Sequence, residues 1–181
     1  MNLAPAMTEL HPAPDLSAIW AALEALTDPE IPVVTLRELG ILREVRRGDD
    51  GGVEVVITPT YSGCPAMAQI EDDIRSTLAA LGLPVRVVTQ LAPAWTTDWI
   101  TEAAREKLRQ YGIAPPSACT PPAAAGERVL RFAARASAEP VPCPRCGSTH
   151  TSELAHFGST ACKSQWRCLD CLEPFDYFKP Y

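Results

Sequence analysis

The chain has little positive charge and few histidines for its length. Its 16 lysines and arginines are outnumbered by 22 aspartates and glutamates, and 3 histidines occur among 181 residues. A formal net charge of −6 leaves no broad basic surface of the kind that supplies affinity for nucleic acid or for anionic lipid. We therefore expect neither a nucleic acid nor a membrane among its partners.

Long apolar runs and targeting signals are also missing. No stretch approaches the roughly 18 apolar residues that predict a membrane-spanning helix, and residues 1–5 carry neither a basic nor an apolar targeting region. We expect a cytoplasmic protein, in which thiols stay reduced. Its 7 cysteines, an odd number, are then better explained as metal ligands or reactive thiols than as disulfide partners.

The motifs of several enzyme classes are absent. The sequence has no pair of Glu-x-x-His motifs for a di-iron site, no glycine-rich nucleotide fingerprint and no ferredoxin-type run of cysteines. Before the C-terminal region its one histidine is His11, so a Cys–His hydrolase is not expected. We therefore do not expect this chain to carry out oxygenation or electron transfer itself.

The composition along the chain predicts one folded domain followed by a spacer and a small module. Hydrophobic residues make up 46% and charged residues 21%, which is typical of a globular protein. Residues 1–14 are expected to be a flexible lead, and residues 113–142, rich in alanine and proline, a linker. A short strand over 127–133 is an alternative within that linker. The folded parts are then 15–112 and 143–181.

Residues 15–112 show the periodicity of an α+β domain. Helices are expected at 15–27, 67–81 and 97–111, and strands at 41–46, 53–58 and 85–88. Glycines and aspartates between the first two strands predict a hairpin, and the strand–helix–strand unit that follows predicts a parallel pair. The expected fold class is therefore α+β, with a small mixed three-stranded sheet, helices and a C-terminal zinc-ribbon-like module.

Two C-x-x-C pairs near the C-terminal end form the clearest chemical motif, and they comprise Cys143, Cys146, Cys168 and Cys171. This spacing brings four thiolates to one tetrahedral ion, and zinc is favoured over iron. Four thiolates leave no open position, so a structural ion is expected. A module of under about forty residues would depend on that ion to fold. Gly147 can tighten the first turn, whereas Leu172 is expected to make the second less regular.

The rest of the C-terminal module leaves alternatives open. Cys162 could be a spare ligand, an exposed thiol activated by Lys163, or a small buried residue. Basic and acidic residues balance in the module, which favours a protein partner over RNA. Its last aromatic residues alternate like an edge strand that packs on the module or extends a partner's sheet: Phe175, Tyr177, Phe178 and Tyr181.

Cys64 is the candidate reactive group of the N-terminal domain. It precedes Pro65, and proline favours the first position of a helix, so Cys64 is expected at the N-cap, where its thiolate would be stabilised. It could be a nucleophile, a soft metal ligand or a small buried residue. Asp28 and Glu30, in a proline-rich loop, could gather beside it or simply cap and solvate that loop. Thr60 could hydrogen-bond the site or shape the turn.

These residues resemble a known family. Asp28-Pro29-Glu30-Ile31-Pro32, Leu39-Gly40-Ile41, Thr58-Pro59-Thr60 and Ser62-Gly63-Cys64-Pro65 resemble, in order, the motifs of the MIP18-like (DUF59) domain, a family associated with iron–sulfur cluster assembly. The resemblance implies that Cys64 is the family's cysteine and that Asp28 and Glu30 are its acidic motif. With the linker and the C-terminal cysteines, nearly the whole chain resembles the D subunits of bacterial phenylacetyl-CoA epoxidase systems.

The resemblance implies a non-catalytic accessory protein of aerobic phenylacetate breakdown. Its expected task is to mature a metal centre, either the iron–sulfur cluster of the reductase subunit or the di-iron site of the oxygenase subunit. Cys64 would then hold iron or an iron–sulfur cluster transiently, and the zinc module would dock the client subunit. The alternatives are a purely structural subunit of the complex and a thiol-dependent enzyme that uses Cys64.

Overall fold

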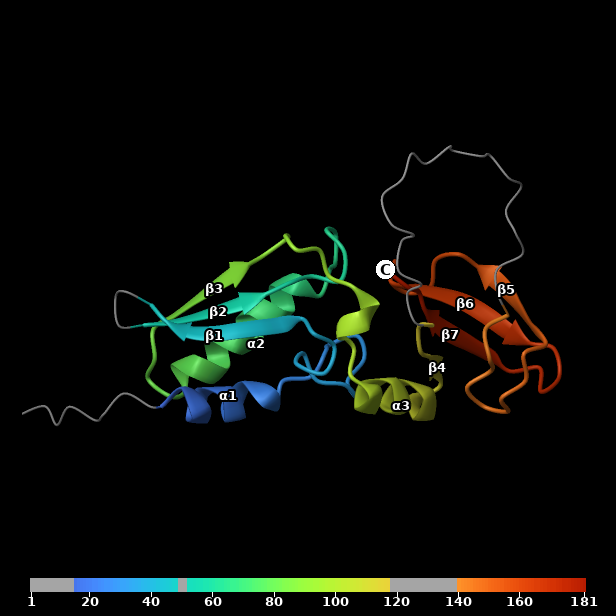
Figure 1. The fold of residues 1–181 in the computed structure, drawn as a ribbon, viewed down its shortest axis with the longest axis horizontal. Coiled ribbons are helices and arrows are strands. Elements are labelled where there is room, and N and C mark those ends of the chain that lie inside the picture. The colour runs from blue at the N-terminus through green and yellow to red at the C-terminus, as the bar shows by residue number, and fades with distance from the viewer. Residues whose placement is uncertain (1–14, 49–51, 118–139) are drawn as a thin grey trace, which may run out of the picture.

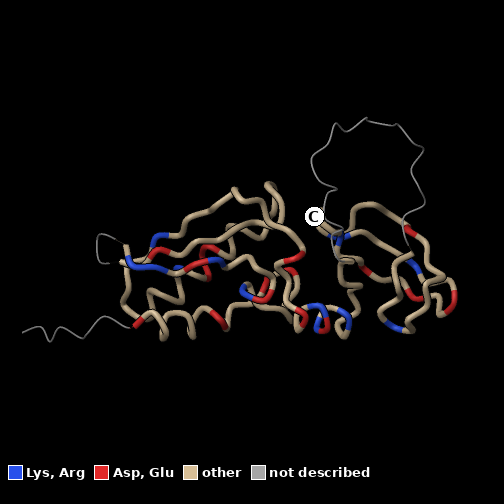
Figure 2. The backbone as a smooth tube through the Cα atoms, viewed as in Figure 1, with Lys and Arg blue, Asp and Glu red and all other residues tan. Residues whose placement is uncertain are grey.

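The structure of the chain is a computed structural model that describes residues 15–48, 52–117 and 140–181. The expected flexible lead and the alternative strand at 127–133 lie outside these residues, as does most of the expected linker. Of the helices described, none combines the length and apolar character needed to cross a membrane. Lysines and arginines are interspersed with aspartates and glutamates over α3 and the C-terminal sheet (Figure 2).

A mixed three-stranded sheet with helices forms the N-terminal part of the described chain, called the N-terminal domain below (Figure 1). β1 is antiparallel to β2, and β2 is parallel to β3. The expected α+β class with a mixed sheet is confirmed. The elements are α1 (Leu16–Glu24), β1 (Leu42–Arg47), β2 (Val53–Ile57), α2 (Met67–Ala79), β3 (Val85–Thr89), the 3₁₀ turn η1 (Thr97–Trp99) and α3 (Glu102–Tyr111).

The core of this domain follows from two sequence patterns. α2 buries Ile70, Ile74 and Leu78, which recur every four residues and therefore share one helix face. β2 is buried along nearly its whole length, as expected of a β-branched strand between two neighbours. α1 and α2 contact each other and pack on the sheet (Figure 1). The loops that connect these elements carry the candidate site residues.

The last predicted helix, 97–111, is divided into two pieces. η1 ends at Trp99, Ile100 is extended with ψ of 124°, and α3 begins after Thr101. The break occurs because the Thr101 side chain caps α3, accepting a hydrogen bond from the Ala104 N–H at 3.2 Å. Gly112, with φ of 104°, ends the helix as predicted.

A four-stranded sheet forms the C-terminal part, in the order β4-β7-β6-β5. Its strands are β4 (Ile113–Ala114), β5 (Thr151–Ala155), β6 (Lys163–Cys168) and β7 (Pro174–Phe178). β4 lies inside the segment expected to be linker and pairs in parallel with β7. The aromatic tail therefore packs on the module's own sheet, which is one of the two predicted alternatives. It is not an edge strand, because β4 and β6 lie on the two sides of β7.

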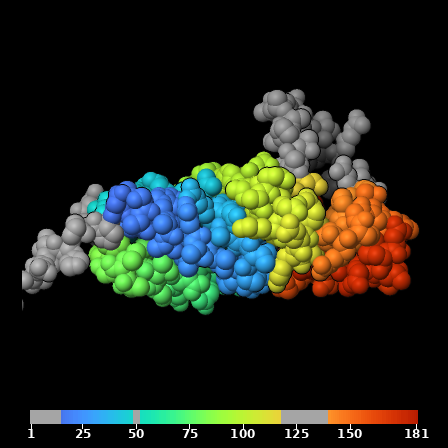
Figure 3. Space-filling view, turned by 90° about the horizontal axis from the view of Figure 1, so that it is seen from below, coloured from blue at the N-terminus to red at the C-terminus, as the bar shows by residue number. Residues whose placement is uncertain are grey.

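The hydrophobic core of the N-terminal part extends to the C-terminal sheet, which also has a smaller core cluster of its own. Phe178, from the end of β7, is 2% exposed and belongs to the same buried cluster as the N-terminal helices. Its ring lies 5.9 Å from that of Trp95, whose Nε1 donates a hydrogen bond to the Leu39 carbonyl. Figure 3 shows the yellow surface of α3 in contact with the orange and red C-terminal surface. The C-terminal sheet therefore sits at a defined place against the N-terminal loops.

Candidate functional site

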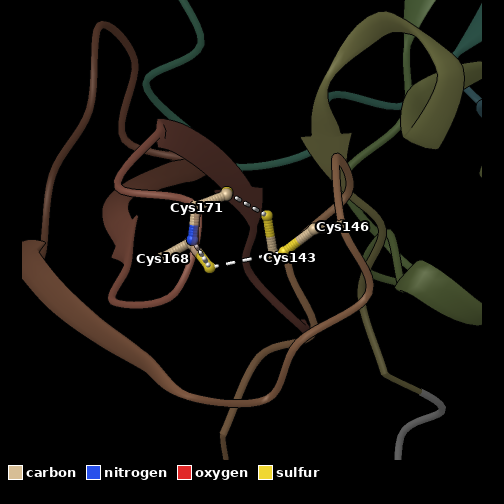
Figure 4. A group of neighbouring side chains, drawn as sticks. All are labelled: Cys143, Cys146, Cys168 and Cys171. Carbon is tan, nitrogen blue, oxygen red and sulfur yellow. Dashed lines mark hydrogen bonds between the residues drawn. The ribbon is translucent and has the colours of Figure 1, made fainter.

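Four cysteine sulfurs come together at one end of the C-terminal sheet (Figure 4). The Sγ atoms of Cys143, Cys146, Cys168 and Cys171 all lie within 4.8 Å of one another. The Cys143–Cys171 separation is 3.8 Å and the Cys146–Cys168 separation is 3.5 Å. A tetrahedral ion with metal–sulfur bonds of about 2.3 Å separates its sulfurs by about 3.8 Å. The four thiols therefore have the spacing of a tetrahedral metal site.

Two similar turns present these sulfurs. Gly147 has φ of 75° and its N–H donates to the Cys143 carbonyl at 2.9 Å. Leu172 takes φ of 65°, so the second turn matches the first, although we expected it to be less regular without glycine. In that turn the Cys171 N–H points at Cys168 Sγ over 3.5 Å, and this contact lowers the pKa of Cys168 to about 6. Backbone N–H groups thus favour a thiolate at Cys168, whereas burial and the neighbouring sulfurs raise the pKa of Cys171 to about 12.

The two histidines of the C-terminal part pair with carboxylates. Nδ1 of His150 lies 3.0 Å from Asp170, and Nδ1 of His156 lies 3.0 Å from Glu153. Neither histidine belongs to the four-sulfur group. The four cysteines therefore complete a tetrahedral ligand set without them.

Two further cysteines line a small cavity between the N-terminal domain and the C-terminal sheet. This interdomain cavity has a volume of about 20 Å³, which is room for one water molecule. Loops before α2, after α1 and between β5 and β6 form its walls. The lining residues are Asp28, Glu30, Ile31, Leu39, Thr60, Cys64, Ala66, Thr160, Cys162 and Phe178.

Asp28 is a buried carboxylate in this cavity. It is 6% exposed, and its Oδ1 accepts hydrogen bonds from the N–H groups of Glu30 and Ile31, each at 2.9 Å. Burial raises the pKa of Asp28, although these two hydrogen bonds oppose the rise. The side chain therefore caps its own loop and also lines the cavity beside Cys64. These are the two roles that the sequence left open as alternatives. The Glu30 side chain is exposed at the rim.

Cys64 is half-buried and differs from its prediction in two respects. α2 begins at Met67 with Ala66 as its N-cap, so Cys64 lies two residues before the cap, in a turn in which its N–H bonds to the Tyr61 carbonyl. Burial raises the pKa of Cys64, and the nearby Cys162 and Asp28 add to the rise. A hydrogen bond from the Ala66 N–H and one from Thr60 oppose it. The predicted lowering of this pKa is wrong because desolvation outweighs the helix terminus.

Cys162 lines the same cavity. It is 9% exposed and its Sγ lies 3.0 Å from Thr160 Oγ1. Burial raises its pKa, with Lys163 opposing, so the buried alternative holds and the exposed, activated thiol does not. A tight loop places it there, since the Gly158 N–H donates to the Lys163 carbonyl at 2.8 Å. Nothing in the sequence alone places this loop beside Cys64.

The comparisons with known proteins match both parts of the chain. Residues 16–89 match a family model described as iron–sulfur cluster assembly protein, and residues 130–179 one described as PaaD zinc beta ribbon domain. Over 168 residues the chain is 48% identical to the D subunit of 1,2-phenylacetyl-CoA epoxidase of Escherichia coli (strain K12), covering 92% of this chain and 93% of that protein.

Relatives of the N-terminal half alone also occur. The Fe-S protein maturation auxiliary factor YitW of Bacillus subtilis (strain 168) is 32% identical over 93 residues, which cover 51% of this chain and 84% of that protein. A solved DUF59 domain from Bacillus anthracis matches with a TM-score of 0.46 at 26% identity, covering 51% of this chain and 89% of that one. The near full-length match to the Escherichia coli protein decides the assignment: the chain belongs to the family of 1,2-phenylacetyl-CoA epoxidase D subunits.

Proposed function

We propose that this protein is a non-catalytic maturation factor for a metal centre of the phenylacetyl-CoA epoxidase complex. The client centre is the iron–sulfur cluster of the reductase subunit or the di-iron site of the oxygenase subunit. The observation that carries the proposal is the convergence of Cys64, Thr60 and Asp28 on one cavity in the domain that matches iron–sulfur assembly proteins. A relative of this domain is named as an auxiliary factor of Fe-S protein maturation.

Cys64 is the proposed transfer group. Its half-buried sulfur would take up iron or a cluster as cargo, and a thiolate of the client would then replace it by ligand exchange. In such an exchange one metal–sulfur bond forms as another breaks, and the metal keeps its oxidation state. A half-buried thiol suits this chemistry because it is shielded from bulk water and still reachable from outside.

The four-cysteine site is proposed to hold zinc in a structural role. Its sulfur spacing fits a tetrahedral ion, and the matching family model describes a zinc ribbon. Four thiolates fill the coordination sphere, so this ion would stabilise the sheet and would not exchange cargo. The sheet is then free to dock the client subunit.

The test is metal and sulfide analysis of the epoxidase subunits produced with and without this protein. We expect the client subunit to lose most of its iron when the protein is absent and when it carries Cys64→Ser. The control is Cys119→Ser, which changes the one cysteine that is neither Cys64, Cys162 nor part of the two C-x-x-C pairs. This variant should leave client iron unchanged. Full iron content with Cys64→Ser in an intact complex would refute maturation and support a purely structural subunit.

A thiol-dependent enzyme is the other alternative, and two observations disfavour it. The cavity beside Cys64 is about 20 Å³, too small for an organic thioester. Burial also raises the pKa of Cys64, so little of it is a nucleophilic thiolate at neutral pH. Turnover of a small thioester or disulfide by the isolated protein, lost in Cys64→Ser, would reverse this conclusion.

A further inference from the structure

We propose that Cys64 and Cys162 together bind a single iron(II) ion, with one thiolate supplied by each part of the chain. The cargo would then be one metal ion and not a preformed cluster. This inference rests on the proposed maturation function for the identity of the metal.

The first support is the placement of the two sulfurs. Cys64 belongs to the loop between β2 and α2, and Cys162 to the loop between β5 and β6, yet both line the same cavity. The charge of Cys162 is among the causes that raise the pKa of Cys64, so each thiol belongs to the other's electrostatic environment. Two thiols that line one cavity, Cys162 buried and Cys64 half-buried, can act as a pair of soft ligands.

The size of the cavity limits what the pair can hold. Its volume of about 20 Å³ accommodates one water-sized particle, and an iron(II) ion is smaller than a water molecule. A cube of four iron and four sulfide atoms is several times larger. A cavity of this volume therefore favours a single ion over a cluster.

The neighbouring charges suit a divalent cation. Oδ1 of Asp28 is used by two backbone N–H groups, and Oδ2 has no hydrogen-bond partner among the described residues. Burial raises the pKa of Asp28 and of both thiols, which favours the protonated form of each group. Binding would release the two thiol protons to solvent, and the two thiolates would then balance the two positive charges of iron(II).

The ligand count separates this pair from the zinc site. Within the described part of the chain, only one group brings three or more His, Cys, Asp or Glu ligand atoms within 4.8 Å of one another, and it consists of Cys143, Cys146, Cys168 and Cys171. A site with two sulfurs leaves coordination positions open for the client's own ligands. The same chain would thus contain one closed tetrathiolate site and one open dithiolate site, suited to retention and to transfer respectively.

The experiment titrates the full-length, zinc-loaded protein with Co²⁺ without oxygen and follows sulfur-to-cobalt charge-transfer absorption. We expect one Co²⁺ to bind beyond the zinc, and we expect iron(II) to compete for it without acid-labile sulfide. Cys64→Ser and Cys162→Ser should each weaken this binding at least about tenfold. Cys162→Ala serves as a second variant because a small apolar residue fits the buried position, and Cys119→Ser is the matched control.

The outcomes are distinct from those of the maturation test. Wild-type binding by Cys162→Ser or Cys162→Ala, each with its zinc retained, would overturn the two-thiol site, even if client iron still required Cys64. Uptake of iron only with an equal amount of sulfide would show a cluster and also overturn it. Loss of cobalt binding in all three variants, with client iron unchanged, would support the two-thiol site and refute the maturation function.

Discussion

Single residues carry the chemistry of this protein, and their environments determine which role each can have. Spacing alone was sufficient to predict that Cys143, Cys146, Cys168 and Cys171 meet, because two short turns fix each pair. The direction of the Cys64 pKa shift was not predictable in this way. Its burial comes partly from Cys162 and Phe178, about one hundred residues later in the chain, and no local pattern encodes that contact.

Leu172 holds a left-handed conformation that favours glycine. We expect Leu172→Gly to raise the stability of the zinc-loaded protein by about 0.5–1 kcal/mol, because an L-residue pays roughly 1–2 kcal/mol at positive φ and glycine's extra chain entropy offsets part of that gain. The side chain is 59% exposed, so little burial is lost. Chemical denaturation measures the change. The reciprocal variant Gly147→Ala should be destabilised, and a less stable Leu172→Gly would contradict the conformational argument.

Asp28 is expected to lower the stability of the folded protein at neutral pH because its carboxylate is buried at the cavity. A raised pKa means that the folded state favours the protonated carboxyl, so stability falls as the pH rises from the ordinary value of about 4 through the raised one. Asp28→Asn retains an oxygen for both N–H groups and should be more stable than wild type by about 1 kcal/mol at pH near 7. The gain should shrink towards pH of about 4.

Denaturant unfolding at several pH values checks this expectation. The control is Asp98→Asn, in which the changed side chain is exposed, and its stability relative to wild type should not vary in the same way. An Asp28→Asn variant that is less stable than wild type at neutral pH would show that further contacts compensate the buried charge.

Helices and strands are the scale at which the sequence was most informative. The stripe of Ile70, Ile74 and Leu78 and the β-branched β2 predicted their elements within a few residues, because amphipathic periodicity follows directly from burial. The division of the third predicted helix was missed, since the 97–111 pattern is compatible with helix throughout. The local competition between side-chain capping by Thr101 and continuation of the helix decides the outcome.

Thr101 should therefore stabilise α3 measurably. Thr101→Ala removes the oxygen that accepts from the Ala104 N–H and should cost about 1 kcal/mol of unfolding free energy. Thr101→Ser keeps that oxygen and is expected to remain close to wild type. Urea denaturation of the two variants provides the comparison, and equal losses in both would mean that the methyl group, not the cap, is responsible.

At the scale of the whole molecule, the fold class was predictable but the arrangement of its two parts was not. The periodicity of 15–112 and the cysteine spacing each describe one part. The contact between them depends on Phe178 packing against Trp95 and on β4, two residues that continue α3 into the other sheet. Such contacts depend on the shapes of two surfaces built from segments that lie far apart in the sequence. The interdomain cavity is a product of that packing and was therefore missed.

Removal of the proposed zinc should affect both parts. Zinc contributes on the order of 10 kcal/mol to folding in small four-ligand modules, so a strong chelator should unfold the C-terminal sheet and expose Trp166, which is now 5% exposed. A red shift of tryptophan fluorescence, reversed by Zn²⁺ but not by Mg²⁺, is the expected result. An unchanged spectrum of the demonstrably metal-free protein would mean that the sheet is stable without its ion.

The packing of Phe178 into the N-terminal core also determines when the two-cysteine site can form in a newly made chain. Cys162 reaches Cys64 only when the C-terminal sheet has folded and Phe178 occupies its place beside Trp95. If that folding requires zinc, the dithiolate cannot exist in a zinc-starved molecule, whatever the supply of iron. Access to the second metal would then depend on prior acquisition of the first, and an immature copy would be unable to capture iron that it could not deliver.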